Sequence, residues 1–348
     1  VETGVGAGAE DKGKDSPPGS PAAQRARAPV PPGWELLDGR SMPTPFSLQL
    51  LRDVVCGVGS LHSLGFVHRD LKPHNVLVTA GGRAKLSDMG LSKRLHAEQS
   101  SFETHGSGSS GWQAPEQLAR GRQTRAVDVF SSGCLLHYVL TAGSHPFGES
   151  CLRDAAIVQG AEPDLAALAH LPEAADLVRS MLSPAAARRP SARGVMEHPL
   201  WWSAVQKLTF LSEVSDRMEL MDRAADPSLL LALEARAAAA LGGADWSARL
   251  HAGLLENLGK FRKYNFSSVR DVLRVVRNKS HHYRELPGDV KALLGPHPGG
   301  FYDYFSSRFP RLLLEMYLFV GEHCRHEHTF LKYFGAVGED EPHLAIAP

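Results

Sequence analysis

One short run of the sequence, residues 68–75, holds the residue types that phosphoryl transfer needs. It reads H-R-D-L-K-P-H-N. Asp70 supplies a carboxylate that can accept the proton of a substrate hydroxyl, and Lys72 supplies a cation near the moving phosphoryl group. Asn75 supplies an oxygen ligand for Mg²⁺. Asp88, thirteen residues after Asn75, is a second candidate Mg²⁺ ligand.

Further motifs follow this run in the order and spacing of the protein-kinase signature set. S-D-M-G, at residues 87–90, stands in the place of D-F-G, and A-P-E ends at Glu116. Asp128 matches the helix-start Asp that holds the catalytic-loop backbone. Arg189 matches the Arg that pairs with the Glu of A-P-E, so we predict a buried Glu116–Arg189 ion pair. Five elements in sequence predict a protein-kinase C-lobe over residues 41–206.

The lobe that covers ATP in a kinase is expected to be missing or truncated. No Gly-rich phosphate loop and no strand Lys precede the H-R-D motif, and residues 1–40 are rich in Gly, Ala, Pro and Ser. We predict that this low-complexity segment is disordered. Lys72, Asn75 and Asp88 are the expected cofactor-binding residues for ATP or ADP, with Mg²⁺ held by Asn75 and Asp88. Kinase activity is expected in a longer parent and not in this chain alone.

A second constellation lies between residues 260 and 287, which are dense in Lys, Arg, His and Tyr and poor in acids. Such a local basic surface suits a phosphate backbone. RNA cleavage without a metal needs a base on the 2′-hydroxyl, an acid on the 5′-leaving oxygen and donors for the charge on phosphorus. The His, Tyr, Asn and Arg side chains of this segment can supply all three. A solvated basic face used for docking is the rival interpretation.

Hydrophobic periodicity predicts that mainly helices position both constellations. Apolar residues recur at helical spacing from Phe46 to Leu64, and Gly65 ends that helix. Residues 76–78 and 84–86 are short apolar runs typical of strands. Helical patterning then dominates from Ala126 onward.

In the basic segment, four residues form one helical stripe that we assign to the core: Val269, Val272, Leu273 and Val276. Loops are predicted at residues 265–268 and 278–286. The chain enters this region at residues 210–217 without a flexible linker, which favours a rigidly docked second domain.

Composition and the apolar runs of the sequence exclude several classes of protein. Lys plus Arg equals Asp plus Glu, 38 each, so any nucleic-acid surface must be local. No apolar run reaches about 18 residues, so no membrane-spanning helix is expected. No signal peptide and no zinc-ligand spacing is present. The chain opens on Val1 and not on Met, which indicates a fragment.

The order of several longer motifs resembles the inositol-requiring enzyme family, the kinase/endoribonucleases of the unfolded protein response. The motifs include H-R-D-L-K-P-H-N, S-D-M-G-L-S-K-R-L, G-W-Q-A-P-E-Q-L, S-V-R-D-V-L-R and R-N-K-S-H-H-Y-R-E-L-P. The residues of the D-M-G and G-W-Q-A-P-E-Q-L motifs are similar to those of plant or algal members. The resemblance extends from about Leu48 to Phe334.

This resemblance implies an all-helical ribonuclease domain of the KEN type over residues 207–335, followed by a tail at 336–348. It implies metal-independent cleavage of stem-loop RNA, in unconventional mRNA splicing and mRNA decay. Tyr264, Asn278 and His282 match the catalytic positions, with His282 as the general acid and Tyr264 assisting the base or positioning the phosphate. Arg277 and Lys279 would bind and neutralise the RNA phosphate.

The resemblance also implies partners and a location. The expected partners are a second copy of the chain, in a homodimer or higher oligomer, and a nucleotide in the kinase lobe; the ribonuclease needs no cofactor. The parent would lie on the cytosolic side of the endoplasmic reticulum membrane, attached through a segment absent from this chain, and this fragment would be soluble. A ribonuclease L-like relative, and a catalytically impaired fragment that serves as a dimerisation or interaction module, are the two alternatives.

Overall fold

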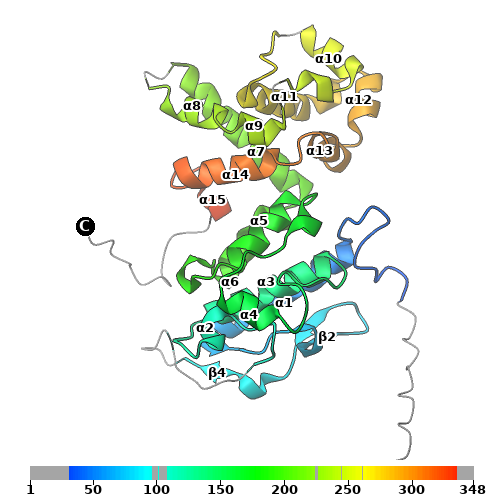
Figure 1. Ribbon diagram of the computed structural model, residues 1–348. Coiled ribbons are helices and arrows are strands. Elements are labelled where there is room, and N and C mark those ends of the chain that lie inside the picture. The colour runs from blue at the N-terminus through cyan, green and yellow to red at the C-terminus, as the bar shows by residue number, and fades with distance from the viewer. Residues whose placement is uncertain are drawn as a thin grey trace, which may run out of the picture.

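The computed structural model describes residues 31–95, 101, 108–223, 226–243, 245–260 and 262–334. The predicted tail at 336–348 and the first 30 residues lie outside this set. The described residues form two lobes, which we call the first lobe (31–202) and the second lobe (203–334) (Figure 1).

The first lobe combines helices with two small antiparallel strand pairs, β1–β4 and β2–β3. Its elements are α1 (Pro45–Ser63), β1 (Phe66–Val67), β2 (Val76–Val78), β3 (Ala84–Leu86), β4 (Lys93–Arg94), α2 (Pro115–Leu118), α3 (Ala126–Leu140), α4 (Arg153–Val158), α5 (Pro172–Met181) and α6 (Ala192–Glu197).

Helix α1 begins and ends where its sequence predicts. The Thr44 hydroxyl accepts a hydrogen bond from the Ser47 amide at 3.1 Å, and Pro45 occupies the first helical turn. Gly65, just past the helix, has a φ of 80°, which suits a residue without Cβ. The apolar stripe is buried from Leu50 to Val58, but Leu64 is 67% exposed because it lies beyond the last helical turn.

The predicted disorder of residues 1–40 does not extend to residues 31–40. The Trp34 ring stacks on Phe46 with centroids 5.1 Å apart, and Leu36 packs on the core beside α1. Trp34 and Leu36 are large apolar side chains of a kind that residues 1–30 lack. Their burial offsets the entropy of ordering this short segment.

The second lobe is built from helices alone within the residues that the structure describes. They are α7 (Ala204–Glu219), α8 (Ser228–Glu234), α9 (Ala237–Leu241), α10 (Ala252–Gly259), α11 (Val269–His281), α12 (Gly288–Leu294), α13 (Gly299–Ser306), α14 (Leu312–His323) and α15 (Leu331–Phe334).

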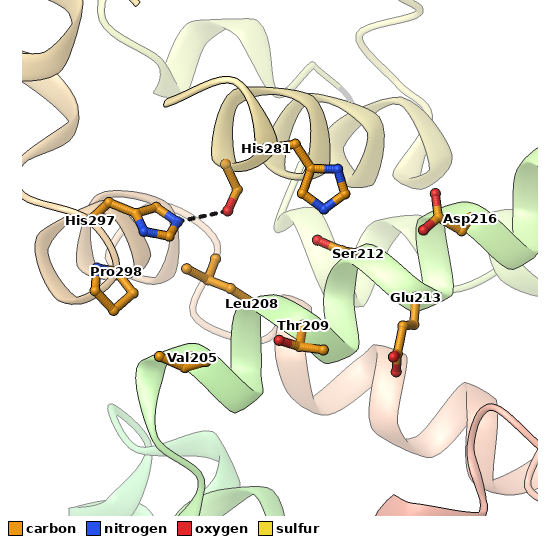
Figure 2. A pocket seen from close by; sticks show the side chains of 10 residues that line it. Val205, Leu208, Thr209, Ser212, Glu213, Asp216, His281, His297 and Pro298 are labelled. Atoms are coloured by element: carbon orange, nitrogen blue, oxygen red, sulfur yellow. Dashed lines mark hydrogen bonds between the residues drawn. The ribbon is translucent and has the colours of Figure 1, made fainter. Parts of the chain in front are cut away.

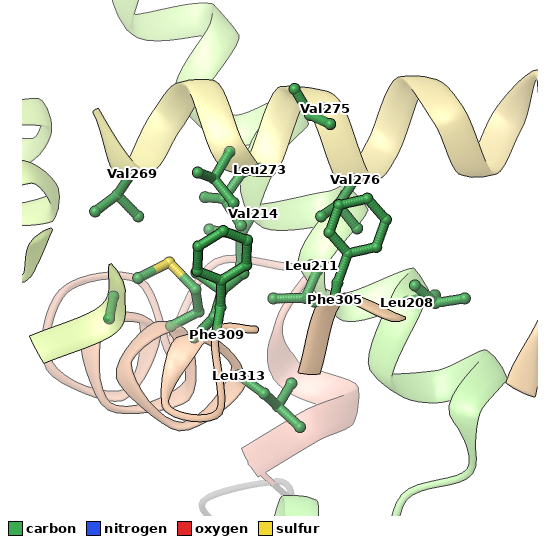
Figure 3. Close-up of a cluster of buried hydrophobic side chains, with 14 of the residues drawn as sticks. Leu208, Leu211, Val214, Val269, Leu273, Val275, Val276, Phe305, Phe309 and Leu313 are labelled. Carbon is green, nitrogen blue, oxygen red and sulfur yellow. The ribbon is translucent and has the colours of Figure 1, made fainter. Parts of the chain in front are cut away.

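One continuous core holds the second lobe together, and α11 lies across it beside α7 (Figure 3). The predicted stripe of α11 is confirmed, because Val269, Val272, Leu273 and Val276 are each at most 1% exposed. Phe305 and Phe309 approach this stripe from below in the same view.

The predicted loop at residues 278–286 is wrong over its first residues. Helix α11 continues to His281, and a single 3₁₀ turn at Tyr283–Glu285 follows. Nothing in the sequence breaks the helix before Pro287, so the backbone hydrogen bonds simply run on. This places Asn278 on a rigid helix and not on a loop.

The two lobes join without a linker. Ser203 caps α7 in a reciprocal pair with Gln206. The adjacent Trp202 ring contacts Phe210, Tyr317 and Tyr333 of the second lobe at centroid distances of 5.1, 5.8 and 5.0 Å.

In the part of the chain that is described, no helix combines the length and apolar character needed to cross a bilayer.

Candidate active sites

Asp128, at the start of α3, anchors residues 68–75, which we call the phosphoryl-transfer loop after the motif predicted above. Its carboxylate accepts hydrogen bonds from the backbone amides of His68 and Arg69, both at 2.8 Å, and lies 2.9 Å from the His62 ring. The anchored backbone holds Arg69 at a φ of 73°, a costly conformation for a residue with a side chain. The role predicted for Asp128 is confirmed.

Asp70 lies at the centre of this site. Its Oδ2 accepts hydrogen bonds from Lys72 Nζ at 2.9 Å and Asn75 Nδ2 at 3.0 Å, and Lys72 also donates to Ser109 Oγ. Asp70 Oδ1 is buried and has no hydrogen-bond partner among the described residues. Burial raises the pKa of Asp70, but its hydrogen bonds, led by that of Lys72, outweigh burial and leave the pKa below its usual value. Asp70 is therefore ionised, and one of its two carboxylate oxygens is not bonded by any described residue.

Asn75 and Asp88 are brought together by the β2–β3 pair. The Asn75 carbonyl accepts hydrogen bonds from Ser87 N at 3.0 Å and Ser87 Oγ at 3.1 Å, and Asp88 is the next residue. Asp88 is exposed, with a φ of 59°. Amide and carboxylate oxygens suit Mg²⁺, and the Asn75 side chain contacts Asp70 Oδ2 through Nδ2 at 3.0 Å. The residues present therefore fit the cation that the motifs imply.

The predicted Glu116–Arg189 ion pair is confirmed. Arg189 Nη1 and Nη2 donate to the two Glu116 carboxylate oxygens at 2.6 and 2.9 Å. The Arg189 side chain is fully buried. The pair ties the A-P-E turn to the segment before α6 and takes no part in the chemistry.

The second candidate site is at the C-terminal end of α11. His282 N donates to the Asn278 carbonyl at 3.1 Å, so these residues occupy successive turns on one face of the helix. The His282 side chain is 65% exposed, and its Nδ1 lies 3.0 Å from Glu285 Oε2. An exposed imidazole on a rigid helix end is accessible to a polymeric substrate.

Tyr264 enters from the loop that leads into α11. Its half-buried ring meets Trp246 edge-on at 6.4 Å. The backbone N–H of the neighbouring Asn265 donates to Asp271 Oδ2 at 2.6 Å, and this bond fixes the loop to the first turn of α11. Asn278 lies seven residues beyond Asp271, which is about 10 Å along the helix axis.

The two predicted phosphate-binding cations are placed differently from each other. Lys279 is only 8% exposed and donates to Asn257 Oδ1 of α10 at 2.5 Å; burial lowers the pKa of Lys279. It therefore points into the lobe and not toward solvent. Arg277 contacts Asn278 Oδ1 through Nε at 3.2 Å and Asp216 Oδ1 through Nη1 at 2.8 Å.

Two acidic residues of α7, Asp216 and Glu219, belong to this site and were missed from the sequence. Glu219 accepts hydrogen bonds from Arg274 and lies 3.4 Å from Arg277 Nη2. The hydrogen bond from Arg274 is the main cause that lowers the pKa of Glu219. Their three-residue spacing on one helix face was the available signal, but the basic partners lie some 60 residues away in the sequence.

A cavity of about 420 Å³ lies between α7 and the end of α11 (Figure 2). His281, Ser212 and Asp216 face it, and His297 closes one side through a hydrogen bond to Ser280 Oγ at 2.8 Å. Within the described residues no three His, Cys, Asp or Glu side chains are grouped to hold a metal ion.

Comparison with known families assigns each lobe. Residues 39–201 match the model of the protein kinase domain, and residues 207–334 match the model described as ribonuclease 2-5A.

Whole relatives align with both lobes at once. The serine/threonine-protein kinase/endoribonuclease IRE1a of Arabidopsis thaliana is 50% identical over 296 residues, covering 84% of this chain and 35% of the relative. The rice protein named serine/threonine-protein kinase/endoribonuclease IRE1 is 51% identical over 304 residues, covering 86% and 34%. An Arabidopsis protein named inactive serine/threonine-protein kinase/endoribonuclease IRE1-like is 39% identical over 321 residues, covering 85% and 57%.

The fold and the two sites define a protein-kinase lobe fused to a 2-5A-type ribonuclease domain. More narrowly, the chain belongs to the inositol-requiring enzyme family of kinase/endoribonucleases. It spans about a third of the length of the first two of these relatives.

Proposed function

We propose that the second lobe is an endoribonuclease whose active site is the C-terminal end of α11. The observation that carries this proposal is the placement of Asn278 and His282 in successive turns, with His282 open to solvent and Arg277 beside Asn278. Helix geometry fixes their spacing before any substrate arrives.

The proposed reaction is transesterification within the RNA. The 2′-oxygen forms a bond to phosphorus, the bond from phosphorus to the 5′-oxygen breaks, and a 2′,3′-cyclic phosphate results. His282 donates the proton that the 5′-oxygen takes up as it leaves. The 2′-hydroxyl gives its proton to water, and Tyr264 assists this removal or positions the phosphate. Arg277 and Asn278 stabilise the charge on the phosphate oxygens. Lys279, buried against Asn257, fixes α11 to α10 and contributes indirectly.

The proposed substrate is stem-loop RNA, cut without a metal in unconventional mRNA splicing and mRNA decay. The names of relatives support this setting: one of them, from Schizosaccharomyces pombe, is called a sensor for unfolded proteins in the ER. We place the longer protein on the cytosolic side of the endoplasmic reticulum membrane, acting as a homodimer or higher oligomer.

For the first lobe we propose Ser/Thr kinase activity with ATP in the longer protein. Asp70, through its unpartnered Oδ1, accepts the proton of the substrate hydroxyl, and Lys72 neutralises charge next to it. Asn75 and Asp88 would hold Mg²⁺, which when bound neutralises the charge of the nucleotide phosphates.

A non-catalytic interaction module is the second candidate function. The 39%-identical relative named inactive supports it, because the same two lobes occur in a protein that bears that name. In that case the chain would associate with intact copies and regulate them.

The deciding experiment incubates the purified chain with a stem-loop RNA in EDTA at high protein concentration. The His282→Ala variant is run beside it, with His328→Ala as the matched control, because His328 is also an exposed histidine of the second lobe. We expect the wild type and His328→Ala to cleave and His282→Ala to lose at least about 100-fold in rate.

The end groups of the products separate the two functions. A cyclic phosphate on the products of the wild type supports the endoribonuclease. Absence of cleavage by all three chains, together with a gel-filtration shift on mixing with an intact family member, would support the interaction module instead.

A further inference from the structure

Four charged side chains form a chain from the interior of the second lobe to its surface, and Arg277 is the third of them. Arg274, 3% exposed, donates to both Glu219 carboxylate oxygens, with Nη2 to Oε2 at 2.8 Å. Glu219 Oε1 lies 3.4 Å from Arg277 Nη2, and Arg277 Nη1 lies 2.8 Å from Asp216 Oδ1. The side-chain exposures of Glu219, Arg277 and Asp216 are 27%, 14% and 59%.

The two carboxylates that hold Arg277 are not equivalent. Glu219 is bound on both oxygens by the buried Arg274, so it cannot leave without breaking a second ion pair. Asp216 is mostly exposed, and exposed ion pairs are weak and screened by salt. Glu219 is thus the fixed contact of Arg277, and Asp216 is the replaceable one.

All three guanidinium nitrogens of Arg277 carry an acceptor in this structure: Asn278 on Nε, Asp216 on Nη1 and Glu219 on Nη2. A phosphate that binds arginine in the strong two-point geometry needs two of its N–H groups. Three of the five N–H groups of Arg277 are thus taken, and the exposed Asp216 is the acceptor that an RNA phosphate can replace at the lowest cost. Asp216 also lines the 420 Å³ cavity (Figure 2), so its carboxylate has open space to turn into once displaced.

We propose that Asp216 occupies the place of an RNA phosphate on Arg277, and that Glu219 is the positioning residue that keeps Arg277 directed at that place during the exchange. This inference rests on the proposed function, since it takes Arg277 as a phosphate contact. The carboxylate of Asp216 competes with the substrate, so the ion pair lowers the affinity of the resting site for RNA.

The second lobe contains a matched control for this arrangement. Arg236 binds the buried Glu315 through Nη1 at 3.0 Å and the 58% exposed Glu322 through Nη2 at 2.7 Å. Glu322→Gln removes the same charge from the same kind of double ion pair, at a site outside the proposed chemistry. It therefore measures the effect of surface charge alone on RNA binding.

The test is equilibrium binding of a stem-loop RNA whose loop carries 2′-O-methyl groups, which block cleavage. Asp216→Asn should tighten binding by about threefold relative to both the wild type and Glu322→Gln. In an Arg277→Ala background the same substitution should give no more than the Glu322→Gln effect. Equal tightening with and without Arg277, or none in either background, would overturn the inference.

Steady-state cleavage of the unmodified stem-loop gives an independent readout. Asp216→Asn should lower KM by the same factor of about three with kcat retained, because it removes a competitor and leaves the reacting groups in place. Glu219→Gln should lower kcat about tenfold, because Arg277 loses its orientation. A wild-type chain that neither binds nor cleaves RNA would overturn the proposed function and this inference together, whereas unchanged KM in Asp216→Asn would overturn this inference alone.

Discussion

The two lobes position their polar residues by different means. In the first lobe, the phosphoryl-transfer loop is fastened through its backbone: Asp128, which is fully buried, accepts two backbone N–H groups of the loop. In the second lobe, Asn278 and His282 are placed by helix geometry alone, and side-chain ion pairs of α7 hold Arg277 next to them.

This contrast follows from what each backbone can do. An irregular loop has no internal hydrogen-bond ladder, so its conformation must be imposed by buried acceptors from elsewhere. A helix satisfies its own backbone and needs only its ends and its apolar face to be fixed. Damage to an anchor should therefore be severe in the first lobe and mild in the second.

The largest effect is expected from Arg189→Ala in the first lobe. Glu116 would lose its partner in a mostly buried site, which typically costs about 3–5 kcal/mol of the free energy of unfolding. Urea denaturation measures the loss, and hydrogen exchange locates it. Faster exchange in α3 and α6 with α11 unchanged is expected; equal loss of protection in both lobes would contradict separate anchoring.

Asp128→Asn should cost about 2 kcal/mol, because the new amide can no longer accept from both backbone N–H groups of the loop. The same denaturation assay measures it. Exchange at His68 and Arg69 should rise by more than exchange elsewhere in the first lobe. An unchanged unfolding midpoint would mean that the loop holds its conformation without this anchor.

Glu234→Ala tests how helix α11 is fixed in the second lobe. Glu234 reaches from α8 to the first turn of α11, where it accepts from Ser268 Oγ at 2.6 Å and Val269 N at 2.8 Å. Its removal should cost about 1 kcal/mol, as for a lost helix cap. Glu234→Gln, which retains an acceptor oxygen, should recover most of that loss in the same urea denaturation assay.

The smallest expected effect is the pH dependence of stability that Glu219 contributes. Because the pKa of Glu219 is lowered in the folded chain, chiefly by Arg274, its contribution to stability is fully present above its ordinary pKa of 4.5 and is lost as the pH falls below it. Between pH 6 and pH 3, the free energy of unfolding should therefore fall less steeply with decreasing pH in Glu219→Gln than in the wild type. Parallel curves would show that this carboxylate titrates normally.

The sequence was sufficient for the features set by local pattern. Strands β2 and β3, the buried face of α11, the Glu116–Arg189 pair and the anchor at Asp128 were all predicted and confirmed. The strands and the buried face of α11 follow from a periodic run of apolar residues. The ion pair and the Asp128 anchor follow from kinase motifs that occur in a fixed order along the chain.

Features that depend on packing between distant segments were not predicted. Lys279 belongs to a basic run, and its burial against Asn257 of α10 is decided by how two helices meet. The acids of α7 that hold Arg277 have the spacing of ordinary surface charges on an amphipathic helix, so the sequence does not single them out. The predicted loop at 278–286 is wrong over residues 278–281, because polar residues alone do not end a helix and no Gly or Pro interrupts the chain there.

Helix α7 can transmit a movement of the first lobe to the ion pairs of Arg277. It starts at Ala204, directly after the last turn of the first lobe, and ends at Glu219 under Arg277. Its 16 residues make a rod about 24 Å long. Such a rod does not stretch, so a tilt of about 5° where it leaves the first lobe moves its far end by roughly 2 Å. That displacement is enough to break or form an ion pair, which makes α7 a lever between the two lobes.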